Sequence, residues 1–146
     1  MVSIEGVITT EPPSTPFAGS AVNVEGVQLV RALGGSEYTI FVTGSTDREG
    51  VEHWMQAHLG TTANIEYPMF VDASAESWER RLSVLRRLTR SYRGVLTVVD
   101  ASPFIKSALQ PLGVTVLQPH FGKNRAVVDE NELMPLRAIS QSWGES

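Results

Sequence analysis

The apolar residues of this chain follow two patterns that alternate along its length. Short, nearly continuous apolar runs are typical of buried strands, and apolar residues three or four positions apart are typical of helices. The runs predict strands at residues 2–9, 38–43, 69–71, 95–100 and 114–117. The helical spacing predicts helices at residues 22–33, 47–59, 74–92, 102–112 and about 131–143.

Strands that alternate with helices pair in parallel, because each crossover returns the chain to the same edge of the sheet. We therefore expect an α/β protein, a three-layer sandwich with a mostly parallel, Rossmann-like central sheet. With 146 residues and no sign of an inter-domain linker, residues 1–146 are expected to form one domain.

Residues that favour turns and caps set the expected element boundaries. Residues 11–20 hold three of the eight prolines, so they predict a loop. The second helix is expected to begin at Ser45 or Thr46, with Glu49 forming a capping box on Thr46. Ser102 followed by Pro103 is a typical helix start.

Composition removes several classes of function. The chain has no cysteine, which excludes disulfides, thiol catalysis and thiolate zinc sites. Its net charge of -4 argues against a broad nucleic-acid footprint. No apolar run approaches the roughly 20 residues of a membrane span and no signal peptide opens the chain, so we expect a cytoplasmic protein without a membrane partner.

Polar residues gather where three of the predicted strands end. They are residues 3–9, residues 43–45 and residues 100–102. In open parallel sheets the carboxyl ends of the strands carry the functional groups. The backbone N–H groups of residues 43–45 precede a helix, so they can form an anion site or serve only as a helix cap.

The three segments VSIEGVIT (2–9), TIFVTGST (39–46) and VLTVVDASPFIKSALQPLGVTVLQ (95–118) suggest a family. Their order and spacing resemble the haloacid dehalogenase-like (HAD) superfamily of magnesium-dependent phosphatases, in particular the phosphatase domain of the polynucleotide-kinase type. The resemblance covers roughly residues 1–120. It implies a minimal or absent cap domain, because residues 10–36 can hold one helix but not a separate lid.

The resemblance also assigns catalytic positions. In this family the first strand ends in D-x-D-G, where the first Asp attacks phosphorus and the second acts as general acid and base. Here Ser3 stands at the nucleophile position and Glu5 at the acid/base position. No His lies near Ser3 in sequence to activate its hydroxyl, so we expect this position to be inert.

The remaining family positions hold the phosphoryl group and Mg²⁺. One carboxylate is kept where the family has two, since Ala101 replaces the second. We expect Mg²⁺ to bind weakly or not at all. The positions implied by the resemblance are Thr43, Gly44 and Arg81 (or its neighbour Arg80) for phosphate, and Asp100 for the metal.

The departures from the family pattern at Ser3, Glu5 and Ala101 suggest two functions. The first is a catalytically impaired or inactive phosphatase-fold protein that binds a protein partner, a phosphorylated ligand or a second copy of itself. The family member that it resembles occurs in phage repair enzymes, which suggests a phage or prophage accessory protein. The alternative is a magnesium-dependent phosphatase for a nucleotide or nucleic-acid phosphate ester, using Glu5 as acid or nucleophile and Asp100 for the metal.

A third interpretation concerns the basic face of the helix predicted at 74–92. Arg86, Arg90 and Arg93 recur at helical spacing, as a nucleic-acid or acidic-partner surface would require. We instead expect a solvated face that is partly paired with Glu76 and Glu79.

Overall fold

The computed structural model describes residues 1–11, 13–34, 39–69, 72, 74–92 and 97–121. Within these residues one parallel sheet has the strand order β3-β2-β1-β4-β5. Pairing sets Val2 beside both Phe41 and Val99, so β1 lies at the centre. The strands are β1 (Val2–Ser3), β2 (Phe41–Val42), β3 (Ile65–Glu66), β4 (Thr97–Val99) and β5 (Thr115–Leu117).

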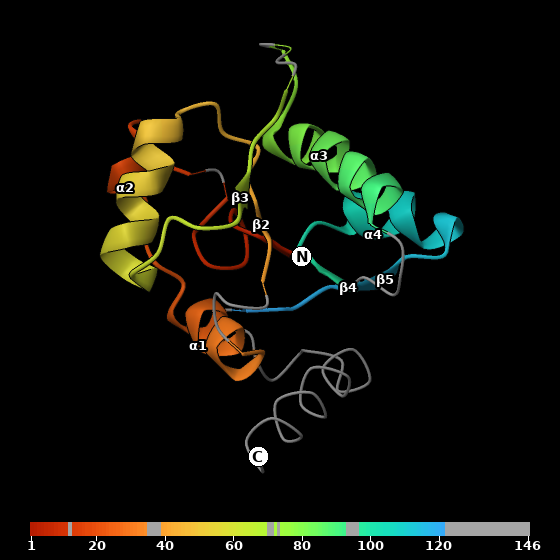
Figure 1. Cartoon of the computed structure of the whole chain (residues 1–146), viewed down its shortest axis with the longest axis horizontal. Coiled ribbons are helices and arrows are strands. Elements are labelled where there is room, and N and C mark those ends of the chain that lie inside the picture. Colours follow the sequence, from red (N-terminus) through yellow and green to blue (C-terminus); the bar gives the residue numbers. More distant parts are fainter. Residues whose placement is uncertain (12, 35–38, 70–71, 73, 93–96, 122–146) are drawn as a thin grey trace.

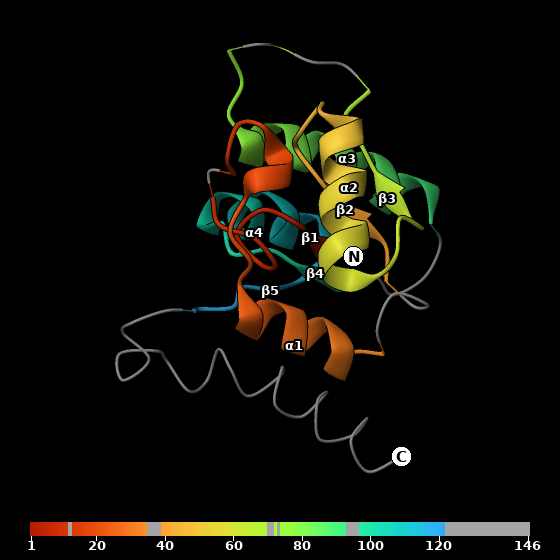
Figure 2. The same cartoon turned by 90° about the vertical axis from the view of Figure 1, so that its left-hand side faces the viewer.

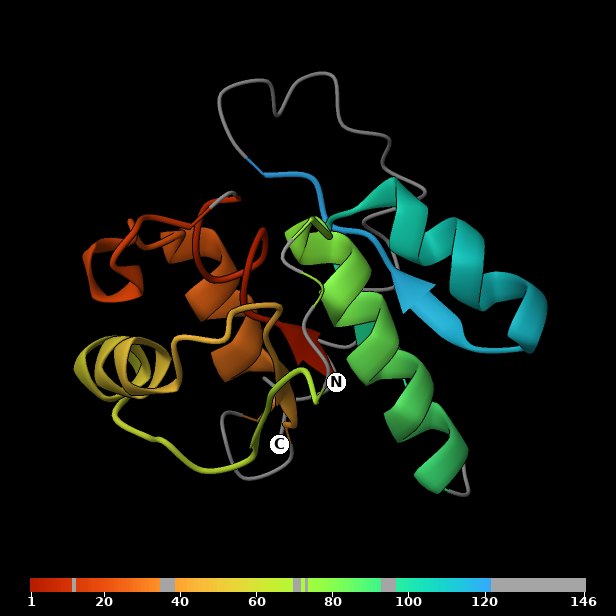
Figure 3. The same ribbon diagram turned by 90° about the horizontal axis from the view of Figure 1, so that it is seen from above.

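Helices cover both faces of this sheet (Figures 1 and 3). They are α1 (Val24–Ala32), α2 (Arg48–Leu59), α3 (Ser77–Ser91) and α4 (Pro103–Leu109). In Figure 3, α1 and α2 lie on one side of β1 and α3 and α4 on the other. The α/β class and parallel sheet predicted from the sequence are therefore confirmed.

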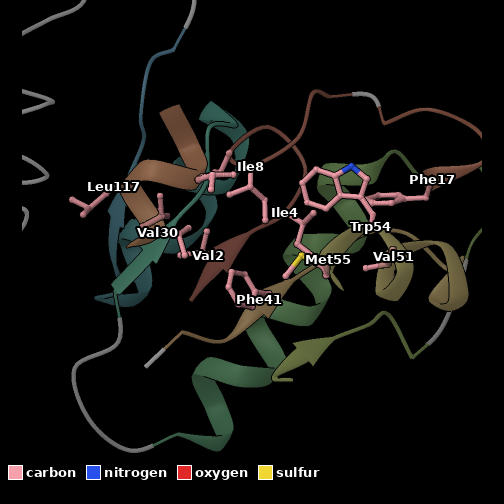
Figure 4. Packing of buried hydrophobic residues seen from close by; sticks show 13 residues of the cluster. Val2, Ile4, Ile8, Phe17, Val30, Phe41, Val51, Trp54, Met55 and Leu117 are labelled. Atoms are coloured by element: carbon pink, nitrogen blue, oxygen red, sulfur yellow. The ribbon is translucent and has the colours of Figure 1, made fainter. Parts of the chain in front are cut away.

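Neighbouring residues of a strand point to opposite faces, and this divides the core into two clusters. Phe41 packs with α1 and α2, whereas Val42 packs with α3 and α4. Figure 4 shows the first cluster, in which Trp54 of α2 lies beside Phe17 and Met55 beside Ile4. The second cluster is built on Leu82, Leu85, Leu88, Val98, Ile105, Leu109 and Val116.

Three strand predictions were wrong in extent or place. Of the strand predicted at 38–43, the structure has Phe41–Val42, and residue 38 lies outside the described part of the chain. The first strand covers only Val2–Ser3, because Gly6 has a φ of 84° and the Ile8 amide bonds back to the carbonyl of Ile4. The third strand is Ile65–Glu66 rather than 69–71. Pro68, directly before that run, has no N–H to continue the ladder. Residues 70 and 71 lie outside the described part of the chain.

The helix predictions hold in position and differ at the ends. Asp47, not Ser45 or Thr46, caps α2, and its side chain accepts from the Gly50 amide. The capping box belongs to α3, between Glu76 and Glu79. After α4 the chain continues as a short 3-10 helix at Gln110–Leu112. The helix expected at about 131–143 lies outside the described residues.

Residues 13–34 form a short 3-10 helix (Phe17–Gly19) followed by α1. α1 lies along the sheet on the side away from α3 (Figure 2) and buries Val27 and Val30 in the core. It therefore belongs to the body of the fold. Among the described residues, no helix combines the length and apolar character needed to cross a bilayer.

Candidate functional site

The candidate residues meet at the carboxyl edge of the three central strands. Ser3 ends β1 and Glu5 follows it, Thr43 follows β2, and Asp100 follows β4. All four side chains are buried. The strand order β2-β1-β4 brings them together, although 97 positions separate Ser3 from Asp100 in the sequence.

Ser3 and Asp100 are hydrogen-bonded partners. The Ser3 hydroxyl donates to Oδ2 of Asp100, and the Ser102 amide donates to Oδ1 over 2.8 Å. Arg81 of α3 binds the same carboxylate, with Nε 2.9 Å from Oδ2 and Nη2 3.3 Å from Oδ1. Both carboxylate oxygens are therefore occupied, and no exposed surface remains on Ser3, Arg81 or Asp100.

This arrangement does not fit a magnesium ion. Mg²⁺ is held by free carboxylate oxygens and water, whereas Asp100 faces the Arg81 guanidinium. Ala101 adds no ligand. Within the described residues no group of three or more His, Asp or Glu side chains is arranged to hold a metal. A magnesium ion at Asp100 would require Arg81 to move away.

Glu11 is a site residue that the sequence did not indicate. Its carboxylate binds Arg81 with Oε1 2.8 Å from Nη1 and Oε2 3.1 Å from Nη2. The Ser77 hydroxyl accepts from Nη1 over 2.9 Å. Burial by itself lowers the pKa of Arg81, but the charge of Asp100 and the bonds to Glu11 outweigh it and raise this pKa above its usual value.

Glu5 is buried beside the residues predicted to bind phosphate. Its Oε1 accepts from the Thr43 hydroxyl over 2.6 Å and from the Gly44 amide over 3.0 Å. Its Oε2 is buried without a hydrogen-bond partner among the described residues. Burial raises the pKa of Glu5, against the opposing charge of Arg81 and the bonds to Thr43 and Gly44. A carboxyl in this setting can hold and donate a proton.

Arg80, the alternative to Arg81, has a different environment. Its Nη1 lies 3.4 Å from the Gly44 carbonyl and its Nη2 2.9 Å from the Ala75 carbonyl, while Nε is buried without a partner in the described part of the chain. Gly44 allows the start of α3 to lie this close, because a Cβ at Gly44 would be 2.4 Å from the Ser77 carbonyl oxygen. Arg81 thus occupies the centre of the site and Arg80 its side.

A pocket of about 260 Å³ opens next to Glu5 and Arg80. Its walls come from the loop before α1, the start of α2 and the start of α3. Phe17 supplies an apolar wall, and it packs edge-on against Trp54 with ring centroids 6.2 Å apart. Pro13 also lines the pocket, and the polar side chains of its wall include Ser45, Asp47 and Ser77.

The basic face of α3 lies away from this pocket. Arg87 pairs with Glu66 over 3.2 Å, while Arg86 and Arg90 are exposed and line a separate groove of about 490 Å³. Glu76 and Glu79 bond to each other's backbone at the start of α3. Arg93 lies outside the described residues.

The chain was also compared with known proteins. No protein-family model, curated protein or solved structure matches it. The likeness to the HAD superfamily therefore depends on the sequence segments named above.

Proposed function

We propose that this protein has a HAD-like phosphatase fold and acts by binding, without hydrolysing a phosphate ester. The observation that carries the proposal is the bond between Ser3 and an Asp100 already held by Arg81. A phosphatase of this kind needs an ionised carboxylate that can reach phosphorus. At that position this chain has a fully buried hydroxyl.

Asp100 is a poor partner for activating Ser3. Its oxygens also accept from Arg81 and from the Ser102 amide, so its carboxylate is already engaged on both sides. A nucleophile also needs access to substrate, and Ser3 and Asp100 are fully buried and, unlike Glu5, are not among the residues that line the pocket. Loss of a covalent nucleophile costs several orders of magnitude in rate, which supports binding over turnover.

The binding capacity that remains lies at Glu5. Thr43 and Gly44 donate to Oε1 of Glu5, and Oε2 has no hydrogen-bond partner in the described region. Glu5 is also one of the residues that line the 260 Å³ pocket. A phosphorylated ligand, or a phosphorylated segment of a partner protein, is the class that the resemblance favours for this edge of the sheet.

Restoring the family residues tests this proposal. The triple variant Ser3→Asp, Glu5→Asp, Ala101→Asp is expected to gain magnesium-dependent release of phosphate from p-nitrophenyl phosphate. The matched control carries Ser3→Asn with the same two other changes and is expected to stay inactive. If both triple variants release phosphate at the same magnesium-dependent rate, the assigned nucleophile position is wrong.

A second function, magnesium-dependent phosphatase activity on a nucleotide or nucleic-acid phosphate ester, is favoured by one observation. Glu5 is a buried carboxyl with a raised pKa beside a pocket, as a general acid requires. Magnesium-dependent turnover of 3′-phosphorylated oligonucleotides that Glu5→Gln abolishes would support it. No turnover by the wild-type protein across nucleotides and oligonucleotides would exclude it.

A further inference from the structure

Buried polar atoms without partners are rare in folded proteins and indicate where a water or ligand belongs. In the described part of the chain three side-chain atoms are in this state: Oε2 of Glu5, Nε of Arg80 and the hydroxyl of Tyr67. Glu5 and Arg80 line the same pocket. Two of the three orphaned atoms therefore belong to side chains at one place.

Gly44 fixes Glu5 and Arg80 relative to each other. Its amide donates to Oε1 of Glu5 over 3.0 Å, and its carbonyl accepts from Nη1 of Arg80 over 3.4 Å. Both side chains are thus tied to one residue, and Oε2 of Glu5 and Nε of Arg80 have no hydrogen-bond partner in the described part of the chain. This geometry suits a ligand group with two acceptor atoms, provided that Glu5 carries a proton on Oε2.

We propose that this pocket binds the oxyanion group of a small ligand between Arg80 and the neutral carboxylic acid form of Glu5. The inference rests on the proposed binding function and names the ligand class. A carboxylate, sulfate or phosphate group has the two acceptors required: one for the Arg80 N–H and one for the Glu5 O–H.

The charges around Glu5 agree with an anion rather than a cation. Arg80 and Arg81 both come from α3, but Arg81 is paired with Asp100 and Glu11 and does not line the pocket, so Arg80 is the positive group that a ligand meets. Asp47, at the start of α2, has its oxygens engaged by the amides of Gly50 and Phe17, at 3.0 Å and 3.4 Å. A cationic ligand would face Arg80, whereas an anion would complete the bond that Nε of Arg80 lacks.

The pocket is large enough for the group and part of its carrier. Its volume of about 260 Å³ is several times the roughly 30 Å³ that one water occupies in the liquid. The ring of Phe17 on the wall would pack against the non-polar part of the ligand.

Binding must then depend on pH in a particular way. At a pH where free Glu5 is ionised, each anion bound takes up one proton, so the affinity falls as the pH rises, by up to about tenfold per pH unit. In Glu5→Gln the amide oxygen replaces Oε1 and the N–H₂ replaces the protonated Oε2. This variant therefore binds the anion with an affinity that does not change with pH.

The test is an NMR titration of the full chain with sulfate, and separately with acetate, between pH 6 and pH 8, where neither probe changes its charge appreciably. The reporter is the Gly44 amide. Wild type is expected to bind more weakly as the pH rises wherever free Glu5 is ionised, and Glu5→Gln equally at every pH. Arg80→Met is expected to lose roughly tenfold to a hundredfold in affinity, and the exposed Arg86→Met on the same helix serves as the unchanged control.

The two probes separate the ligand classes. Stronger binding of sulfate assigns a tetrahedral group such as phosphate, and stronger binding of acetate assigns a carboxylate. No shift of the Gly44 amide with either probe overturns the inference, as does wild-type pH dependence in Glu5→Gln. If Arg80→Met does not fold, Arg80→Lys, which keeps the charge and lacks Nε, must still weaken binding. None of these results requires turnover, so the inference can fail while the absence of hydrolysis stands.

Discussion

Arg81→Met should be among the most destabilising single substitutions in this chain. Arg81 is fully buried and contacts two carboxylates, of which Asp100 is also fully buried. Without the guanidinium, the side chain of Asp100 keeps the donors of Ser3 and Ser102 as its partners among the described residues. Removing one partner of a buried ion pair costs about 3–5 kcal/mol, because the other charge is left uncompensated.

This loss is large against the total stability of a domain. Folded domains are stable by about 5–15 kcal/mol, and in a chain of this size each kcal/mol shifts the melting temperature by roughly 2–4 °C. Arg81→Met should therefore lower the melting temperature by roughly 6–20 °C. Circular dichroism during heating and unfolding in urea measure the change.

A double variant distinguishes a lost charge partner from lost packing. Arg81→Met with Asp100→Asn leaves no buried charge at this position, so most of the stability should return. The exposed Arg86→Met on α3 should change the free energy of unfolding by less than about 0.5 kcal/mol. The reasoning is refuted if Arg81→Met costs less than about 1 kcal/mol, or if the double variant is no more stable than the single one.

Three further substitutions test individual contacts. Burial raises the pKa of Glu5 in the folded state, so the contribution of this carboxyl to stability is complete below about pH 4.5 and declines as the pH rises through the raised value. In thermal unfolding, Glu5→Gln should therefore gain stability relative to wild type as the pH rises above about 4.5. A stability difference that stays constant with pH would contradict this. Gly44→Ala places a Cβ 2.4 Å from the Ser77 carbonyl oxygen and should cost about 1–3 kcal/mol in urea unfolding, whereas a neutral effect would place Ser77 elsewhere. Asp47→Ala removes the cap on the Gly50 amide and should cost about 1 kcal/mol, while an unchanged urea midpoint would reject Asp47 as the cap.

The α/β class and the parallel sheet could be predicted because the apolar runs at residues 38–43, 95–100 and 114–117, which contain β2, β4 and β5, are long enough to be distinctive. The error at the third strand has a different origin. Ile65–Glu66 is two residues long and only half-buried, so it has no pattern of its own. This segment is a strand because it pairs with β2, and pairing between distant segments leaves no pattern in the local sequence.

The candidate site likewise contains residues that could be predicted from the sequence and one that could not. Thr43 and Asp100 could be grouped in advance, because each ends a predicted strand and parallel strands end at one edge. Ser3 and Glu5 lie within the first predicted strand, and the family resemblance is what placed them beside Thr43 and Asp100. Glu11 could not, since it stands in a proline-rich loop and meets Arg81 across 70 positions.

The sequence also contains a pattern that distinguishes Arg81 from Arg80. Arg81 precedes Leu85 by four positions and Leu88 by seven, so it lies on the buried face of α3. This spacing assigns Arg81 to the interior and Arg80 to the side of the helix, as the structure has them.

The most direct test is phosphate release from p-nitrophenyl phosphate and from a 3′-phosphorylated oligonucleotide, measured with wild type and Asp100→Asn in the presence and absence of Mg²⁺. If Ser3 and Asp100 are held in a closed ion-pair cluster, wild type should release no more phosphate than Asp100→Asn under either condition. Magnesium-dependent release by wild type that disappears in Asp100→Asn and in Ser3→Ala would show that these residues catalyse, and would contradict the proposal of binding without hydrolysis.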